Sequence, residues 1–179
     1  MYSTDVGSGD AQADNGSSGE TGGTSDSGTE ITLTGSVPMV EGLDVGVGVY
    51  EQETDSASGA GTYHADEGTA YIKYSTGPVS VGYQKGVVVN SAGSEETQYT
   101  NEYIGISYKI SDDLSVSYNE MESRKSNDST DMTQEFDSIS LSYSMGGMTI
   151  GIADADVSNS SYTSGRSMEE TSVSLSIAF

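Results

Sequence analysis

The sequence predicts an all-β fold, an antiparallel up-and-down β-barrel that crosses a membrane with about nine strands. Three observations support this prediction: short segments in which apolar and polar residues alternate, connections that are alternately short and long, and aromatic residues beside the short connections. Alternation of this kind places one set of side chains on each face of a strand. No apolar run approaches the roughly 18 to 20 residues that a membrane-spanning helix needs.

Composition alone does not indicate an ordinary soluble globule. The chain has 6 Lys and Arg against 28 Asp and Glu, a formal charge of -22, and only 33% hydrophobic residues. Low hydrophobicity with high net charge favours disorder, so the prediction of a fold depends on the patterning. The absence of Cys excludes disulfides and thiolate metal sites. The strong negative charge opposes binding to nucleic acid.

Two regions follow one another along the chain. Residues 1–29 are rich in Gly, Ser, Asp and Thr without a hydrophobic period, and we expect an acidic extracellular loop or disordered tail there. Residues 30–179 carry the predicted barrel, because apolar residues recur there at every second position. The alternating segments are 31–37, 43–49, 70–74, 79–83, 104–108, 114–118, 139–143, 148–152 and 173–179.

The connections between these segments fall into two classes that alternate. Short turns are expected at 39–42, 75–78, 111–113 and 145–147, and long polar loops at 53–67, 89–98, 123–134 and 157–168. Short turns on one side and long loops on the other are typical of a transmembrane barrel, with the turns in the periplasm and the loops outside. The hairpin repeats with a period of about 35 residues.

A soluble β-sandwich would show the same local alternation, so alternation alone does not decide between the two folds. The unequal connections favour the barrel, as do aromatic residues on the apolar face near the short turns. The predicted aromatic girdle consists of Tyr74, Tyr108, Tyr143 and Phe179. A soluble acidic β-domain that binds calcium is a further alternative.

The end of the chain carries a more specific pattern. Phe179 is the last residue, and it follows Val173, Leu175 and Ile177 on one face. This segment resembles the closing strand of a Gram-negative outer-membrane barrel, which implies that these four residues form the signal read by the assembly machinery. Residues 68–179, with EYIGISYKISDDLSVSY, SISLSYSMGGMTIGIA and SLSIAF, resemble the C-terminal half of a Gram-negative general porin.

The porin resemblance implies a homotrimer of sixteen-stranded barrels in the outer membrane, in contact with lipid and lipopolysaccharide. Nine strands depart from the even number found in single-chain bacterial barrels, whose termini both lie in the periplasm. The closing strand would run toward the periplasm, which places residues 1–29 outside the cell. We therefore expect the chain to be a fragment that lacks the first strands of its barrel.

Lys85 tests the register of the fourth segment. Unbroken alternation from Val79 places this lysine on the apolar face. A lysine at the bilayer midplane costs roughly 2 to 4 kcal/mol. We expect either a bulge near Gly86 or a position close to the outer interface, where the side chain can snorkel.

The resemblance implies a porin that admits small hydrophilic solutes and ions by passive diffusion, without enzymatic activity. The residues expected to line the lumen are Tyr71, Lys73, Gln84, Tyr103, Lys109 and Asn119. Acidic residues concentrate in the long loops. They either keep these loops solvated or enrich cations at the mouth, which would give mild cation selectivity. The alternative function is a non-conducting structural or adhesive surface barrel.

No cofactor is expected, although the acidic loops could bind divalent cations. The run from Asp154 through Asp156 to Asn159 begins like a calcium loop but lacks its Gly and distal Glu. His64 is the only histidine, which excludes a His-dependent triad and a multi-histidine metal site. The sequence contains no G-x-S-x-G elbow and no phosphate-binding loop.

Overall fold

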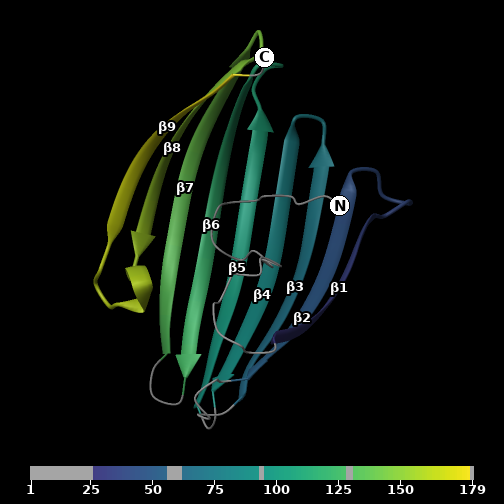
Figure 1. Cartoon of the computed structure of the whole chain (residues 1–179). Coiled ribbons are helices and arrows are strands. Elements are labelled where there is room, and N and C mark those ends of the chain that lie inside the picture. The colour runs from purple at the N-terminus through teal and green to yellow at the C-terminus, as the bar shows by residue number, and fades with distance from the viewer. Residues whose placement is uncertain (1–25, 56–61, 93–94, 128–130, 178–179) are drawn as a thin grey trace.

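The computed structural model describes residues 26–55, 62–92, 95–127 and 131–177. These residues form a single antiparallel sheet in which each strand pairs with the next in sequence (Figure 1). The strands are β1 (Asp26–Ser36), β2 (Leu43–Asp55), β3 (Thr62–Thr76), β4 (Val79–Ala92), β5 (Glu95–Lys109), β6 (Leu114–Asn127), β7 (Asp131–Met145), β8 (Met148–Ser158) and β9 (Met168–Ile177). One short 3-10 turn, η1 (Ser160–Tyr162), lies between β8 and β9.

The sheet is curved and open, with β1 and β9 at its two edges (Figure 1). The short turns lie at one end of the strands, and the long connections, including η1, lie at the other. The predicted fold is confirmed in its class, its strand number and its alternating connections. Within the described ranges, no helix is both long enough and apolar enough to cross a membrane.

The strands are longer than the sequence predicted. β2 continues to Asp55 and β3 already begins at Thr62, inside the expected loop 53–67. The expected loops 89–98 and 123–134 are likewise mostly strand. These extensions are mostly polar and lack apolar alternation, and backbone pairing stabilises them. A prediction based on apolar alternation therefore ended each strand too early. β1 likewise begins at Asp26, before the predicted barrel boundary at residue 30.

Successive hairpins are displaced along the strand direction. Tyr74 on β3 pairs with Val81 on β4, and Val81 pairs with Ile106 on β5, two residues from Tyr108. The same displacement recurs further on, because Tyr108 pairs through Val116 with Leu141, two residues from Tyr143. A stagger of about one residue per strand is the shear that tilts strands in a barrel wall.

The two faces of the sheet differ in chemistry and exposure. On the face that we call the apolar face, Val, Ile, Leu and Tyr side chains are exposed, such as Ile104 at 50% and Ile139 at 54%. No apolar side chain among the described residues is buried, so the described sheet has no hydrophobic core of its own. A soluble sandwich would need a second layer over this face, and the described residues supply none.

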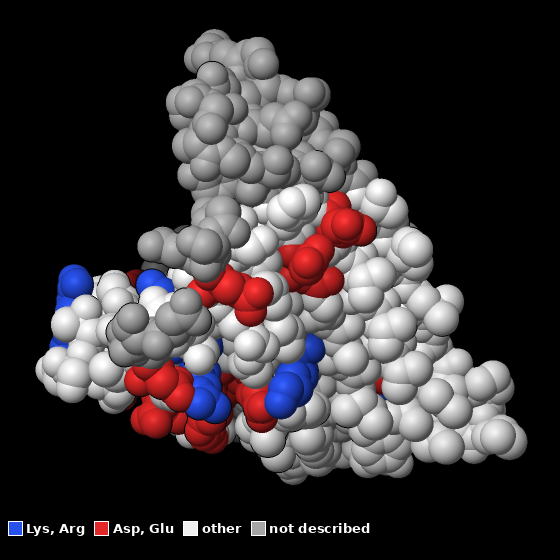
Figure 2. Space-filling view, turned by 90° about the horizontal axis from the view of Figure 1, so that it is seen from below, with Lys and Arg blue, Asp and Glu red and all other residues white. Residues whose placement is uncertain are grey.

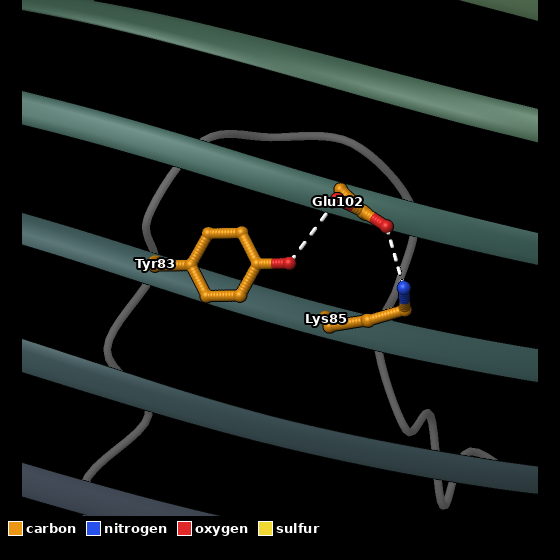
Figure 3. Close-up of polar contacts among 3 residues, drawn as sticks. All are labelled: Tyr83, Lys85 and Glu102. Carbon is orange, nitrogen blue, oxygen red and sulfur yellow. Dashed lines mark hydrogen bonds and ion pairs between the residues drawn. The ribbon is translucent and has the colours of Figure 1, made fainter.

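Lys85 lies on the apolar face, and the register around it is continuous. It pairs with Ala70 on one side and Glu102 on the other, and Gly86 pairs in turn with Thr69 and Asn101. Of the two alternatives expected for Lys85, the bulge near Gly86 is therefore excluded. Instead, the Lys85 ammonium lies 2.5 Å from a Glu102 carboxylate oxygen, and Tyr83 donates a 3.1 Å hydrogen bond to the other oxygen (Figure 3).

Candidate functional site

The opposite face, which we call the polar face, is hollowed between β3 and β6. In a transmembrane barrel this face would line the interior. The hollow has a volume of about 210 Å³. Five of the six residues that the sequence predicts as pore-lining meet there: Tyr71, Lys73, Gln84, Tyr103 and Asn119. Lys109 shares this face with Tyr103, but it lies at the short-turn end of β5, outside the hollow.

Small residues form the floor of the hollow. Gly82 and Gly105 pair directly with each other across β4 and β5, and both line the hollow. The larger side chains around this floor are fixed by cross-strand contacts. The Gln84 amide donates to the Thr69 hydroxyl at 3.1 Å, and the Tyr71 ring lies over Gly46, where an added Cβ would come within 2.2 Å of it.

The charge on the polar face is distributed unevenly. Among the side chains that the structure describes, the polar face of β4 to β8 carries Lys109 and Lys125 and no carboxylate. The acids of these strands whose side chains are described, Glu102 and Asp137 among them, lie on the apolar face toward the long connections. Figure 2, which views the molecule from that end, shows the acidic side chains gathered in several patches with Lys and Arg between them.

At the long-loop end, η1 brings Tyr162 into contact with the polar face of β5 and β6. The Tyr162 and Ser123 hydroxyls are 2.7 Å apart, and Ser123 is only 4% exposed. The Tyr162 ring lies 5.6 Å from the Tyr99 ring, measured between centroids. The Lys125 ammonium is 5.7 Å from the Tyr99 centroid and 5.8 Å from that of Tyr162. The sequence analysis missed this cluster, because Tyr162 falls in a polar stretch with no periodic signal.

The backbone that carries Tyr162 is strained. Asn159, Ser161 and Tyr162 all have positive φ angles, 52°, 57° and 54°. Each non-glycine residue in this region costs on the order of 1 to 3 kcal/mol. Two hydrogen bonds to β7 hold the turn in place: the Asn159 amide donates to the Thr133 carbonyl at 3.0 Å, and the Ser161 N–H donates to Gln134 at 2.8 Å.

The predicted aromatic girdle is described in part. Tyr74, Tyr108 and Tyr143 lie on the apolar face near the short turns and are 43%, 46% and 42% exposed. A second row, which the sequence analysis missed, lies further from the turns. Its members are Tyr83 and Tyr118, whose hydroxyls donate to Glu102 and Asp137 respectively.

The predicted assembly signal lies on the edge strand β9. Val173, Leu175 and Ile177 are exposed on its apolar face. Phe179, which belongs to both the girdle and the signal, lies outside the described residues. The role of these residues in assembly stays a prediction.

The calcium-loop interpretation of residues 154–159 is wrong. Asp154 and Asp156 lie within β8, both on the apolar face, and Asp154 accepts a 2.6 Å hydrogen bond from Thr171. An extended strand cannot wrap its side chains around one ion as a calcium loop does. Across the described parts of the chain, no group of three or more His, Asp or Glu residues could hold a metal ion.

One ion pair lies beyond the expected membrane-spanning segments, beside the connection between β6 and β7. The Arg124 guanidinium donates a 2.6 Å hydrogen bond to Asp131 and contacts it through a second nitrogen. This contact holds the pKa of the Asp131 carboxyl below its usual range. This charge-assisted contact links β6 to β7 at the long-loop end of the sheet.

The fold defined by these strands is that of an outer-membrane β-barrel. Two solved structures of OmpT from Vibrio cholerae, one expressed in the outer membrane and one folded in vitro, share it with TM-scores of 0.65 and 0.66. Both are 9% identical in sequence, and the likeness covers 84% of this chain. The chain spans about half of each neighbour, 54% and 53%. No protein-family model and no curated protein sequence matches it.

This likeness is consistent with the predicted location in the outer membrane. It supports the porin resemblance only at the coarser level of an outer-membrane barrel. The prediction that the chain is not an enzyme is corrected by the same finding. A barrel fold shared at 9% identity does not determine function, so it gives no ground for excluding catalysis.

Proposed function

We propose that the protein forms part or all of a water-filled β-barrel channel through which small hydrophilic solutes and ions diffuse. The hollowed polar face opposite an exposed apolar face is the observation that supports this proposal. The Gly and Ser residues that line the hollow leave room for water. A barrel without a channel would instead fill its interior with interdigitating large side chains.

The lining gives the channel its chemistry. Tyr71, Tyr103, Gln84 and Asn119 offer hydroxyl and amide groups that can hydrogen-bond a passing solute. Lys73 contributes the one charged side chain of the described hollow. The acidic side chains at the long-loop end raise the local concentration of cations outside the lumen. We therefore propose mild cation selectivity for the mouth of the channel.

The apolar face would contact outer-membrane lipid, with Tyr74, Tyr108 and Tyr143 at one border. Lipopolysaccharide and further copies of the chain in a trimer are proposed as neighbours of this face. Both proposals can be examined by chemical crosslinking of the protein in outer-membrane preparations.

Single-channel recording in a planar bilayer tests the proposed function. The detergent-solubilised protein should produce discrete open steps, and a salt gradient should give a reversal potential of the sign for cations. Gly82→Phe and Gly105→Phe would fill the floor of the hollow, and each should lower the conductance of the open step. Gly68→Ala, on the apolar face where an added Cβ meets no atom within 4 Å, is the matched control.

Insertion of the protein without any conductance would contradict the channel and support the non-conducting surface barrel. Unchanged conductance in both phenylalanine variants would show that ions do not pass this part of the polar face.

A further inference from the structure

We propose that the polar face carries a binding site for small oxyanions at its long-loop end, with Lys125 as the charged group. Tyr99 and Tyr162 form the frame of this site. The Lys125 ammonium lies 5.7 Å and 5.8 Å from their ring centroids, and the two rings are tilted by 57°. Ring faces attract the positive charge without accepting strong hydrogen bonds, so the ammonium keeps donors for a ligand.

Lys125 differs in its surroundings from Lys85 and Arg124, the two cations on the apolar face of β4 and β6. Lys85 is paired with Glu102, and Arg124 with Asp131. The residues that pair with Lys125 across the sheet are Tyr99 and Met132, and neither is acidic. Among the described residues, no carboxylate lies within ion-pair distance of its ammonium. Among the side chains that the structure describes, an incoming anion would therefore meet no competing carboxylate at this lysine.

The frame is pre-organised. Ser123 is nearly buried and holds Tyr162 through its hydroxyl, while it donates a 2.5 Å hydrogen bond to Asn101. The left-handed turn that carries Tyr162 is in turn bonded to β7. Two rings fixed before a ligand arrives lower the ordering cost of binding.

The chemistry of the site selects its ligand. An ammonium with three donors suits a phosphate, sulfate or carboxylate group. The neighbouring hydroxyls and amides of Ser123, Asn101 and Gln134 are neutral, so they add no repulsion. A metal cation would be repelled by Lys125. Binding itself depends only on this cluster, whereas any effect of the site on permeation rests on the proposed function.

Isothermal titration calorimetry of the detergent-solubilised protein tests the site, with inorganic phosphate as the probe at constant ionic strength. Lys125→Gln should weaken phosphate binding by about tenfold, the loss expected for one charge-assisted contact. Lys125→Arg should retain most of the affinity. Lys109→Gln removes the same charge from the same face near the short turns, and it should change the affinity by less than about twofold.

Tyr162→Phe keeps the ring and removes the bond to Ser123, whereas Tyr162→Ala removes both. The alanine variant should therefore weaken phosphate binding more than the phenylalanine variant. Far-ultraviolet circular dichroism of each variant checks that the sheet is intact.

Absence of phosphate binding in the unaltered protein would overturn the site, as would equal affinity in Lys125→Gln. Binding without conductance in the bilayer would leave the site standing and contradict the channel. Conductance without phosphate binding would support the channel and contradict the site, so the two proposals can fail independently.

Discussion

The apolar face of β1 to β3 differs from that of β4 to β8. Counted from the short turns, the first four outward positions of β2 are Leu43, Val45, Val47 and Val49, none of which is charged. On β4, β5, β6 and β8 the fourth position carries a charge. On β7 it is the fifth, because Met145 adds one apolar position next to the turn. We call these residues the charged row: Lys85, Glu102, Glu120, Asp137 and Asp154.

The difference shows that the apolar band narrows along the sheet. Three outward positions span only about 13 Å of strand, whereas the apolar band of a typical barrel is about 25 Å tall. The charged row therefore lies within or at the border of the band. Four of its members are held in polar contacts: Lys85 and Tyr83 contact Glu102, Tyr118 donates to Asp137, and Thr171 donates to Asp154. The β1 to β3 region needs no such contacts, because its apolar positions continue further.

The largest expected effect comes from placing a charge in the wide part of the band. Val47 is 53% exposed on β2 and lies between Leu33 and Ala70. Val47→Lys should lower the free energy of unfolding by about 2 to 4 kcal/mol in lipid vesicles, because lysine loses its hydration near the bilayer midplane. Urea titration of the protein folded into vesicles measures this change.

Glu120→Lys is the matched control, because it places a lysine in the charged row. It should cost less than about 1 kcal/mol, as expected near the interface. Equal costs at both positions would contradict the difference between the two regions.

A smaller effect is expected from breaking one contact within the charged row. Glu102→Gln leaves Lys85 without a carboxylate partner, and it replaces the charged acceptor of the Tyr83 hydroxyl with a neutral amide. The urea midpoint in vesicles should fall by about 1 M. The double variant with Lys85→Gln should recover part of this loss, since it removes the unpaired charge as well. An unchanged urea midpoint in Glu102→Gln would indicate that the charged row is exposed to water and lies outside the apolar band.

The smallest effect is expected at the Arg124–Asp131 pair, beyond the band on the same side of the sheet. Because the folded pKa of Asp131 is lowered, its contribution is present above the unfolded pKa and is lost as pH falls through the folded pKa. Asp131→Asn should therefore lower the urea midpoint slightly at pH 7, and this loss should shrink as the pH falls through the folded pKa of Asp131.

Arg124→Gln removes the same pair from the other side and should produce the same pH-dependent loss. A loss that persists unchanged in acid would show that the pair does not act through its charges.

Much of the fold could be predicted from the sequence, because a period of two is a local property of a strand. The alternation of the few residues around Ile104, Ile139 and Ile150 is enough to assign each of them to the apolar face. The positions shared by Tyr71, Gln84 and Tyr103 on the polar face follow from the same count. The polar strand ends could not be predicted, because backbone pairing stabilises them without any apolar pattern.

The Tyr162 cluster could not be predicted for a different reason. Ser123 and Tyr162 are 39 residues apart in sequence, and their contact depends on a left-handed turn at Ser161 that no residue type there announces. Glycine or repeated Asn would have been a usable signal. Long-range contacts made by an irregular turn lie outside the reach of periodicity.

The stagger of the hairpins has a mechanical consequence. The pairing track that starts at Tyr74, beside the short turns, passes through Val81, Ile106 and Tyr118 and reaches Asp154 in the charged row. One line of neighbouring residues thus climbs diagonally across the whole apolar band. Residues paired on successive strands thus lie at different distances from the short turns. A force along the membrane normal would therefore load the hydrogen bonds of several strand pairs together.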